Sequence, residues 1–208
     1  MPQNKDLKRL VRARMAETGE NYTQALAYVH DQTDLEPLPE AWRITGTRAP
    51  DYEAGLLPGV THGEDRIARL RLRRAVAEPS GFGALVQTIA ADRYLGRRIS
   101  FSALARVTGV TGWAGLWLRI DGNANTITLD NMEDRPLHGT ADWIEASIVL
   151  DVPEPAKILL FGALLSGPGA VDLTRLRFEQ ADQTVPVTRP LSLPDHPQSL
   201  DFAASPAR

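Results

Sequence analysis

The stretch Gly112-Trp113-Ala114-Gly115-Leu116-Trp117-Leu118-Arg119-Ile120-Asp121 has a period of two. Its even positions from 114 to 120 carry only aliphatic side chains, whereas its odd positions from 113 to 119 carry two tryptophans, a glycine and an arginine. Successive side chains of a β-strand point to opposite faces of a sheet, so this pattern predicts a strand with two unlike faces. The aliphatic face suits a protein core. The other face joins flat apolar rings to a guanidinium, which indicates a binding surface.

Similar alternation recurs throughout the middle of the chain, from about residue 41 to residue 180. Apolar side chains occupy alternate positions in 68–72, 99–107 and 144–150, and segment 158–165 is almost wholly apolar. After Leu173 the apolar positions return one residue late, at Leu176, as a β-bulge would produce. Turn residues separate these segments, and about eight short strands without intervening helices predict an antiparallel β-sandwich of two sheets.

The segments before and after this zone have different patterns of apolar residues and prolines. Residues 1–35 carry apolar side chains at helical spacing, interrupted near Gly19 and Asn21, and therefore predict a helical hairpin in which Gly19 ends one helix and Asn21 caps the next. Residues 36–40 contain two prolines and are expected to form a stiff linker. Residues 181–208 contain five prolines and lack apolar periodicity, which predicts a flexible, mostly disordered tail.

Composition narrows the possible classes of function. The 208 residues carry a formal net charge of −3, so no overall basic field draws the chain to nucleic acid or anionic lipid. Because the chain has no cysteine, disulfides, thiolate zinc sites and thiol nucleophiles are excluded. No apolar run approaches the roughly 18 residues of a membrane span, and the N-terminal segment lacks a secretory pattern. We therefore expect a cytoplasmic protein that does not enter the membrane.

The tryptophan face of segment 112–121 is the leading candidate for a ligand site. Trp113 and Trp117 would stack on a ring, and Arg119 and Gln87 would form hydrogen bonds to it. Asp130 and Asn131 would fix the orientation of the ligand at the rim. The alternative is that both tryptophans belong to the core under a covering layer. An unpaired guanidinium is costly to bury, so the presence of Arg119 on this face favours an open surface.

Other chemistry has less support in the sequence. The four histidines have no metal-ligand spacing, and neither a phosphate-binding loop nor a nucleophile elbow is present, so we predict no cofactor and no catalytic residues. Asp130 and Asn131 could also help to hold a structural calcium ion, although an ordinary polar turn is favoured. An enzyme with a cupin-like or isomerase-like cavity is the weaker functional alternative.

Two sets of basic residues stand out against the acidic balance. Lys5, Lys8, Arg9 and Arg12 lie on one face of the first predicted helix and could contact DNA or a protein partner, or could simply face solvent. Arginines also occupy positions 69, 71 and 73, where they suit an exposed sheet edge that discourages the addition of another strand.

Several motifs of the middle zone resemble a family of bacterial β-sandwich domains that are similar to carbohydrate-binding modules. The motifs are Asp51-Tyr52-Glu53, Gly81-Phe82-Gly83 with Gln87, Gly112–Trp117, Asp130-Asn131-Met132 with Arg135-Pro136, Gly139-Thr140 with Asp142-Trp143, and Leu165-Ser166-Gly167. The resemblance covers about residues 41–180. It implies a jelly-roll, galactose-binding-like fold and a binding or sensing role, since members often stand beside DNA-binding helices and carry the general label of transcriptional regulator.

The predicted hairpin resembles the two helices of ribbon-helix-helix antitoxins. The similarity runs from Leu7 to Val29 and is strongest at Glu17-Thr18-Gly19-Glu20. Such proteins read DNA with a strand before the first helix, whereas Met1–Asp6 lacks a strand pattern. The combined expectation is a non-catalytic domain that binds a small polar or sugar-like ligand, with a regulatory role through the helices as the alternative.

Overall fold

The computed structural model describes residues 3–77 and 79–188 and consists mainly of antiparallel β-structure. Its elements are α1 (Gln3–Thr18), α2 (Tyr22–Gln32), β1 (Trp42–Thr45), β2 (Tyr52–His62), β3 (Asp65–Leu72), β4 (Phe82–Ala90), β5 (Arg98–Asp121), β6 (Thr126–Asp130), β7 (Leu137–Asp151), β8 (Ile158–Ser166) and β9 (Ala170–Gln180), with short 3₁₀ turns at Ala49–Asp51 and Asp92–Tyr94. The predicted β-sandwich with an N-terminal helical hairpin is confirmed.

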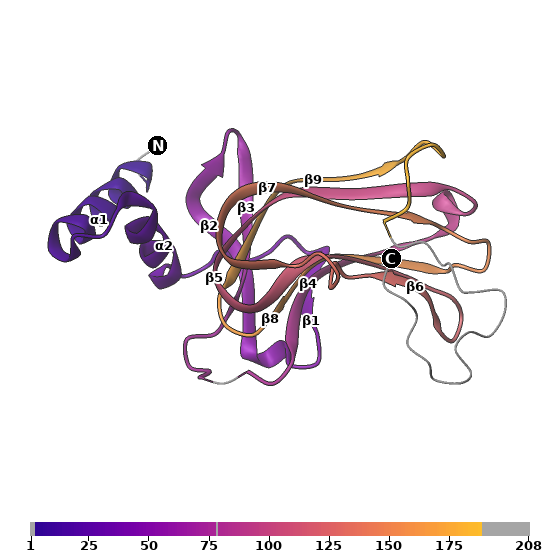
Figure 1. The fold of residues 1–208 in the computed structure, drawn as a ribbon, viewed down its shortest axis with the longest axis horizontal. Helices are drawn as coiled ribbons and strands as arrows, with labels where there is room; N and C mark the ends of the chain where they lie inside the picture. The colour runs from indigo at the N-terminus through magenta and orange to yellow at the C-terminus, as the bar shows by residue number, and fades with distance from the viewer. Residues whose placement is uncertain (1–2, 78, 189–208) are drawn as a thin grey trace, which may run out of the picture.

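The long strand β5 belongs to both layers of the sandwich (Figure 1). Its first part, 98–108, pairs with β9 on one side and β7 on the other, and β3 and β2 continue that layer beyond β9. Its last part, 113–121, pairs with β8 and β6, and β4 and β1 continue beyond β8. We call the first layer the hairpin sheet and the second the tryptophan sheet.

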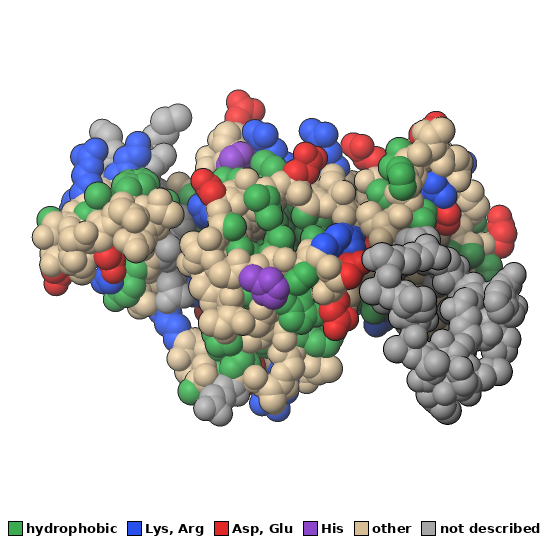
Figure 2. Space-filling view, viewed as in Figure 1, with side chains coloured by type: hydrophobic (Ala, Val, Ile, Leu, Met, Phe, Trp, Pro, Cys, Tyr) green, Lys and Arg blue, Asp and Glu red, His purple; other side chains and the backbone are tan. Residues whose placement is uncertain are grey.

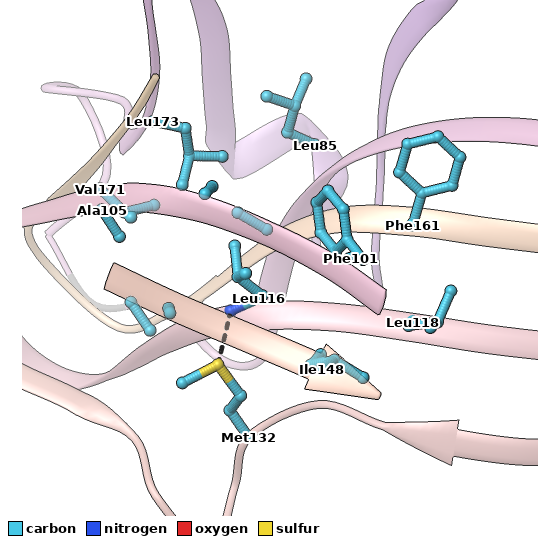
Figure 3. Packing of buried hydrophobic residues seen from close by; sticks show 14 of the residues in the cluster. Leu85, Phe101, Ala105, Leu116, Leu118, Met132, Ile148, Phe161, Val171 and Leu173 are labelled. Carbon is cyan, nitrogen blue, oxygen red and sulfur yellow. Dashed lines mark hydrogen bonds between the residues drawn. The ribbon is translucent and has the colours of Figure 1, made fainter. Parts of the chain in front are cut away.

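The core lies between the two sheets and is built from the aliphatic face of β5. Leu116, Leu118 and Ile120 are fully buried, and Figure 3 shows Leu116 and Leu118 near Phe101 and Phe161. The rings of Phe101 and Phe161 have centroids 5.2 Å apart. Each such side chain contributes about 1.5–3 kcal/mol when it leaves water, so this alternating strand accounts for a large share of the stability.

The predicted β-bulge is present in β9. Ser102 of β5 pairs with Arg177 and Leu104 with Thr174, so β9 places one more residue than β5 between the two pairs. Arg175, inside this interval, has a φ of 52°, which is the left-handed conformation typical of such irregularities. The apolar phase of β9 therefore slips where the sequence predicts it.

The helical hairpin begins its second helix with a reciprocal cap. Gly19 has a φ of 73°, and its backbone N–H donates to Met15 O. Gln24 N donates to Asn21 Oδ1 at 3.0 Å, and Asn21 N donates to Gln24 Oε1 at 3.1 Å. A small apolar cluster of Val11, Ala25 and Val29 then joins the two helices. None of the helices in the described part of the chain is long and apolar enough to cross a bilayer.

The segments on either side of the sandwich lie against it. Glu36 and Leu56 exchange two backbone hydrogen bonds of 2.9 Å, so the predicted linker is attached to β2. At the other end, Arg98 Nη1 donates to Gln183 O at 2.7 Å and to Val185 O at 2.6 Å. Residues 181–188, which we expected in the tail, therefore contact β5, and the rest of the predicted tail, 189–208, lies outside the described residues.

Arg69 and Arg71 contradict the prediction of an exposed edge, whereas Arg73, just after β3, has a side chain that is 50% exposed. β3 lies between β2 and β9, and Arg69 and Arg71 are only 1% and 2% exposed. Arg69 forms an ion pair with Asp172 of β9, and Arg71 forms one with Glu53 of β2. Alternation correctly placed these side chains on one face, but a single strand pattern could not reveal that acidic neighbours and the hairpin cover that face.

Candidate functional site

The outer face of the tryptophan sheet carries a small apolar cluster of its own. It is separated from the core by the sheet, because its residues alternate with core residues along each strand. The buried members are Ala84, Val86, Trp117, Leu160 and Leu164, with Phe82 and Trp113 packed against them. The predicted division of segment 112–121 into an aliphatic face and a tryptophan face is therefore present.

A cavity with a volume of about 510 Å³ lies over this cluster. Its lining residues come from β1, β4, β5, β6 and β8 and from the turns beside them. They are Arg43, Thr45, Gly46, Thr47, Phe82, Trp113, Trp117, Arg119, Leu129, Asn131, Glu133, Leu160 and Leu164. Four of the six predicted site residues, Trp113, Trp117, Arg119 and Asn131, thus meet in one cavity, which we call the tryptophan cavity.

Trp117 forms the apolar floor of the tryptophan cavity. It is 7% exposed, and the residue directly opposite on β8 is Gly162, which presents no side chain to compete with the indole. The indole Nε1 is buried and has no hydrogen-bond partner among the described residues. Trp113, four residues earlier in β5, is half-buried at the edge of the cluster. The cavity therefore has one buried indole ring, that of Trp117, and one more accessible ring, that of Trp113.

Arg119 provides the charged part of the same wall. Its Nη2 donates to Asp121 Oδ2 at 2.8 Å, and its Cζ lies 5.8 Å from the Trp117 ring centroid. Its Nε, like the Trp117 Nε1, is buried without a partner in the described part of the chain. An unmade hydrogen bond of a buried donor costs about 1–3 kcal/mol. Both donors belong to side chains that line the tryptophan cavity.

The turn after β6 forms another part of the wall. A Cβ on Gly115 would lie 2.9 Å from Met132 Cβ and 3.2 Å from Asn131 O, so this turn approaches β5 where the strand has no side chain. Met132 has a φ of 60°, and Leu116 N donates to its sulfur at 3.3 Å (Figure 3). Asn131 Oδ1 accepts a bond from Glu133 N at 3.3 Å. The glycine between the two tryptophans thus positions Asn131 at the cavity.

Asp130 does not lie at the rim as we predicted. It pairs with Leu118 on the core side, is fully buried, and accepts hydrogen bonds from Met132 N, Arg135 Nη2 and Thr188 Oγ1 at 3.0, 2.7 and 2.6 Å. Burial alone would raise the pKa of Asp130, but these hydrogen bonds outweigh it and hold the pKa below its ordinary value. Its carboxylate therefore stabilises the fold and does not face the cavity. No group of three potential metal-binding side chains occurs within 3–77 and 79–188.

Gln87 also lies away from the tryptophan cavity. Its side chain is on the same face of β4 as those of Leu85 and Ile89, which pack into the main core. In the sheet, Gln87 pairs with Phe161 of β8. The β4 residue that lines the cavity is Phe82, whose side chain is on the opposite face of the strand. The sequence placed Gln87 on a neighbouring strand correctly, but its face depends on the phase of β4 relative to the core.

Sequence reasoning missed several polar lining residues of the tryptophan cavity. Arg43 and Thr45 come from β1, which pairs with β4 at the edge of the sheet, and Glu133 lies in the turn after β6. Alternation around Trp42 and Ile44 places Arg43 and Thr45 on one face, and this signal is present in the sequence. A strand of four residues, however, is too short for its pattern to be distinctive.

Comparison with known proteins gives one informative relative. No protein family model matches the sequence. Over 176 residues, or 83% of this chain, it is 35% identical to YbfP of Bacillus subtilis strain 168, which is named an uncharacterized HTH-type transcriptional regulator. The chain spans 59% of the length of that relative.

Solved structures share the fold at low sequence identity. The enzymatically active domain of bacteriophage CBA120 tailspike protein 4 gives a TM-score of 0.51 at 12% identity, over 68% of this chain and 20% of that one. The arabinose-bound α-L-arabinofuranosidase MgGH51 also gives 0.51 at 12% identity, over 72% and 25%. The CBM22-1 xylan-binding domain of Xyn10C from Paenibacillus barcinonensis gives 0.49 at 12% identity, over 70% and 88%.

Proposed function

We propose that the tryptophan cavity binds a small polar or sugar-like ligand without transforming it. The observation that carries this proposal is the pair of buried donors, Trp117 Nε1 and Arg119 Nε, which lack partners among the described residues and belong to side chains that line one open cavity. A site that combines an apolar wall with a few convergent polar groups suits a small molecule that has both kinds of surface.

The lining suggests a role for each residue. Trp113, the more accessible ring, would stack on an apolar face of the ligand, as the edge and face of an indole permit. Trp117 and Arg119 would donate to ligand oxygens, and Asn131 and Glu133 would supply an amide and a carboxylate at the rim. A sugar offers this combination, because its ring carries hydroxyl oxygens around its edge and C–H groups on its faces.

A ligand screen with matched tryptophan variants tests the proposal. Sugars, oligosaccharides and polar metabolites are added to the purified protein and the melting temperature is recorded, since a ligand specific to the native state stabilises it. For a compound found in this way, we expect Trp113→Ala to weaken binding about tenfold, equivalent to roughly 1.4 kcal/mol. Trp117→Phe should also weaken binding, because it keeps the apolar floor and removes the indole N–H.

Trp143→Ala is the matched control, since Trp143 is also half-buried but lies on β7 of the other sheet. Its dissociation constant should equal that of the unaltered protein. The proposal fails if no compound raises the melting temperature, or if Trp113→Ala binds as tightly as the control.

A regulatory role through the hairpin is the second candidate, supported by the name of the relative and by the surface of α1. Lys8 and Arg12 are exposed on α1, where basic side chains gather over the hairpin (Figure 2). Binding to duplex DNA should then weaken steeply as salt rises. Reversing both charges, Lys8→Glu with Arg12→Glu, should abolish it. The absence of DNA binding at low salt would exclude this role.

A further inference from the structure

A second hollow lies between α2 and the outer face of the hairpin sheet. Its volume is about 260 Å³, and it is lined by Tyr22, Thr23 and Leu26 of α2 and, on the sheet, by Arg69 and Arg106 together with Val107, Thr108, Thr140, Ala141 and Asp142. In Figure 1 the hairpin stands at one side of the sandwich, with α2 nearer to the strands than α1. We call this space the hairpin hollow; it shares no lining residue with the tryptophan cavity.

The floor of the hairpin hollow contains a buried cluster of charges. The Asp172 carboxylate accepts hydrogen bonds from Arg69 Nε at 2.6 Å and from Arg69 Nη2 at 2.9 Å. Its Oδ2 also accepts hydrogen bonds from Arg106 Nη2 at 2.6 Å and from Arg106 Nε at 3.1 Å. The side chains of Asp172 and Arg69 are 1% and 2% exposed, and that of Arg106 is 17% exposed. Burial would raise the pKa of Asp172, but the two guanidinium groups overcome this and lower it.

This cluster has more positive than negative charge. Two guanidinium groups share one carboxylate, and each uses only Nε and Nη2 for it, which leaves Nη1 of Arg69 and Nη1 of Arg106 without a hydrogen bond to the described residues. Excess charge is costly away from bulk water. The other carboxylate at the hollow, Asp142, is exposed, and its Oδ1 accepts a bond from Trp143 N. Water screens Asp142 more than it screens the buried pair.

The helix α2 is also separated from the sheet further along its length. Another hollow, of about 340 Å³, is lined by Tyr28 of α2 and again by Arg69 and Thr108. Arg73 and Arg74 join this lining. Arg69 therefore borders both hollows beside α2.

From these contacts we infer that the hairpin hollow is a second ligand site, which takes a small molecule bearing an oxyanion, either a carboxylate or a phosphate. The oxyanion accepts hydrogen bonds from Arg69 and Arg106, whose planar groups suit such oxygens. The rest of the ligand contacts Tyr22, Thr23 and Leu26. Because α2 supplies one wall and the sheet the other, a bound anion holds the hairpin on the sandwich.

Anion titration of the complete chain tests this inference. Inorganic phosphate and citrate are the probes, and sodium chloride at equal ionic strength is the reference. We expect one probe to raise the melting temperature above the chloride value and to slow amide exchange in α2. The variant Arg106→Gln should weaken that binding at least tenfold, while Asp172 keeps its bidentate partner Arg69. On the helix side, Thr23→Val should weaken it several-fold.

Two further variants separate this site from nonspecific charge and from the tryptophan cavity. Arg177→Gln removes an exposed arginine of β9 outside the hollow and should leave anion binding unchanged. Trp113→Ala should also leave it unchanged, so failure of the proposed sugar-like site does not affect this test. Equal stabilisation by chloride and both probes, equal losses in Arg106→Gln and Arg177→Gln, or unchanged exchange in α2 would each overturn the inference.

Discussion

At the scale of single residues, Asp130 connects the end of β6 to the rest of the molecule. Its carboxylate binds the backbone of its own turn at Met132, the guanidinium of Arg135 and the hydroxyl of Thr188. Those partners hold the turn that carries Asn131 and also attach the segment after β9. A residue that we expected to touch a ligand therefore acts on the cavity indirectly, by positioning its wall.

The variant Asp130→Asn should make stability less sensitive to acid. The pKa of Asp130 is depressed in the folded state, so its stabilising contribution is present above the unfolded pKa of about 4 and is lost as the pH falls through the folded value. Asparagine does not titrate there. We expect a loss of about 1–3 kcal/mol at pH 7, and a flatter dependence than the parent below pH 4, measured by urea unfolding. An acid dependence of Asp130→Asn that runs parallel to that of the parent would contradict the assignment.

The face of a residue was predictable where its own strand carried a long pattern. Trp113, Trp117 and Arg119 share a face because the eight residues 113–120 alternate without interruption. Gln87 and Asp130 were misplaced, since the phase of β4 relative to the core and the pairing of Asp130 with Leu118 depend on contacts between distant segments. Local alternation says which residues share a face, and tertiary contacts decide what that face meets.

At the scale of elements, the approach of the β6–β7 turn to β5 depends on Gly115. The variant Gly115→Ala would place a methyl group 2.9 Å from Met132 Cβ and 3.2 Å from Asn131 O, so the turn must move. We expect a loss of about 1–3 kcal/mol in unfolding free energy and weaker ligand binding in the tryptophan cavity. Gly122→Ala is the control, because its nearest contact is the end of the Ile127 side chain at 3.3 Å. Similar losses in both variants would mean that the close approach is unimportant.

The elements themselves were largely predictable, and their partners were not. Both helices, their caps and the bulge in β9 follow from local signals, namely Gly19, Asn21 and the delayed return of apolar residues at Leu176. The position of β3 inside a sheet was missed, because its row of arginines is typical of an exposed edge and the neutralising residues Glu53 and Asp172 lie on other strands. Charge balance in a sheet is a property of adjacent strands and cannot be derived from one of them.

At the scale of the whole molecule, β5 connects the two candidate sites. Its first part supplies Arg106 and Thr108 to the hairpin hollow, and its last part supplies Trp113, Trp117 and Arg119 to the tryptophan cavity. The two spaces lie on the outer faces of different sheets. A strand that passes from one layer into the other is what allows a short stretch of sequence to reach both.

The attachment of the hairpin to the sandwich should depend on Gly55. A Cβ at this position would lie 2.5 Å from Glu36 O and 2.6 Å from Leu35 Cβ, where the linker pairs with β2. Gly55→Val should therefore displace the linker and release the hairpin while the sandwich stays folded, because the core between the sheets is untouched. Faster amide exchange in α1 and α2 and new proteolytic cleavage near residues 36–40 would report this release.

Thr61→Val, at an exposed position of the same strand, should leave both readouts unchanged. If Gly55→Val instead unfolds the protein in a single transition without selective exposure of the helices, the hairpin and the sandwich form one cooperative unit, and independent movement of the hairpin is excluded.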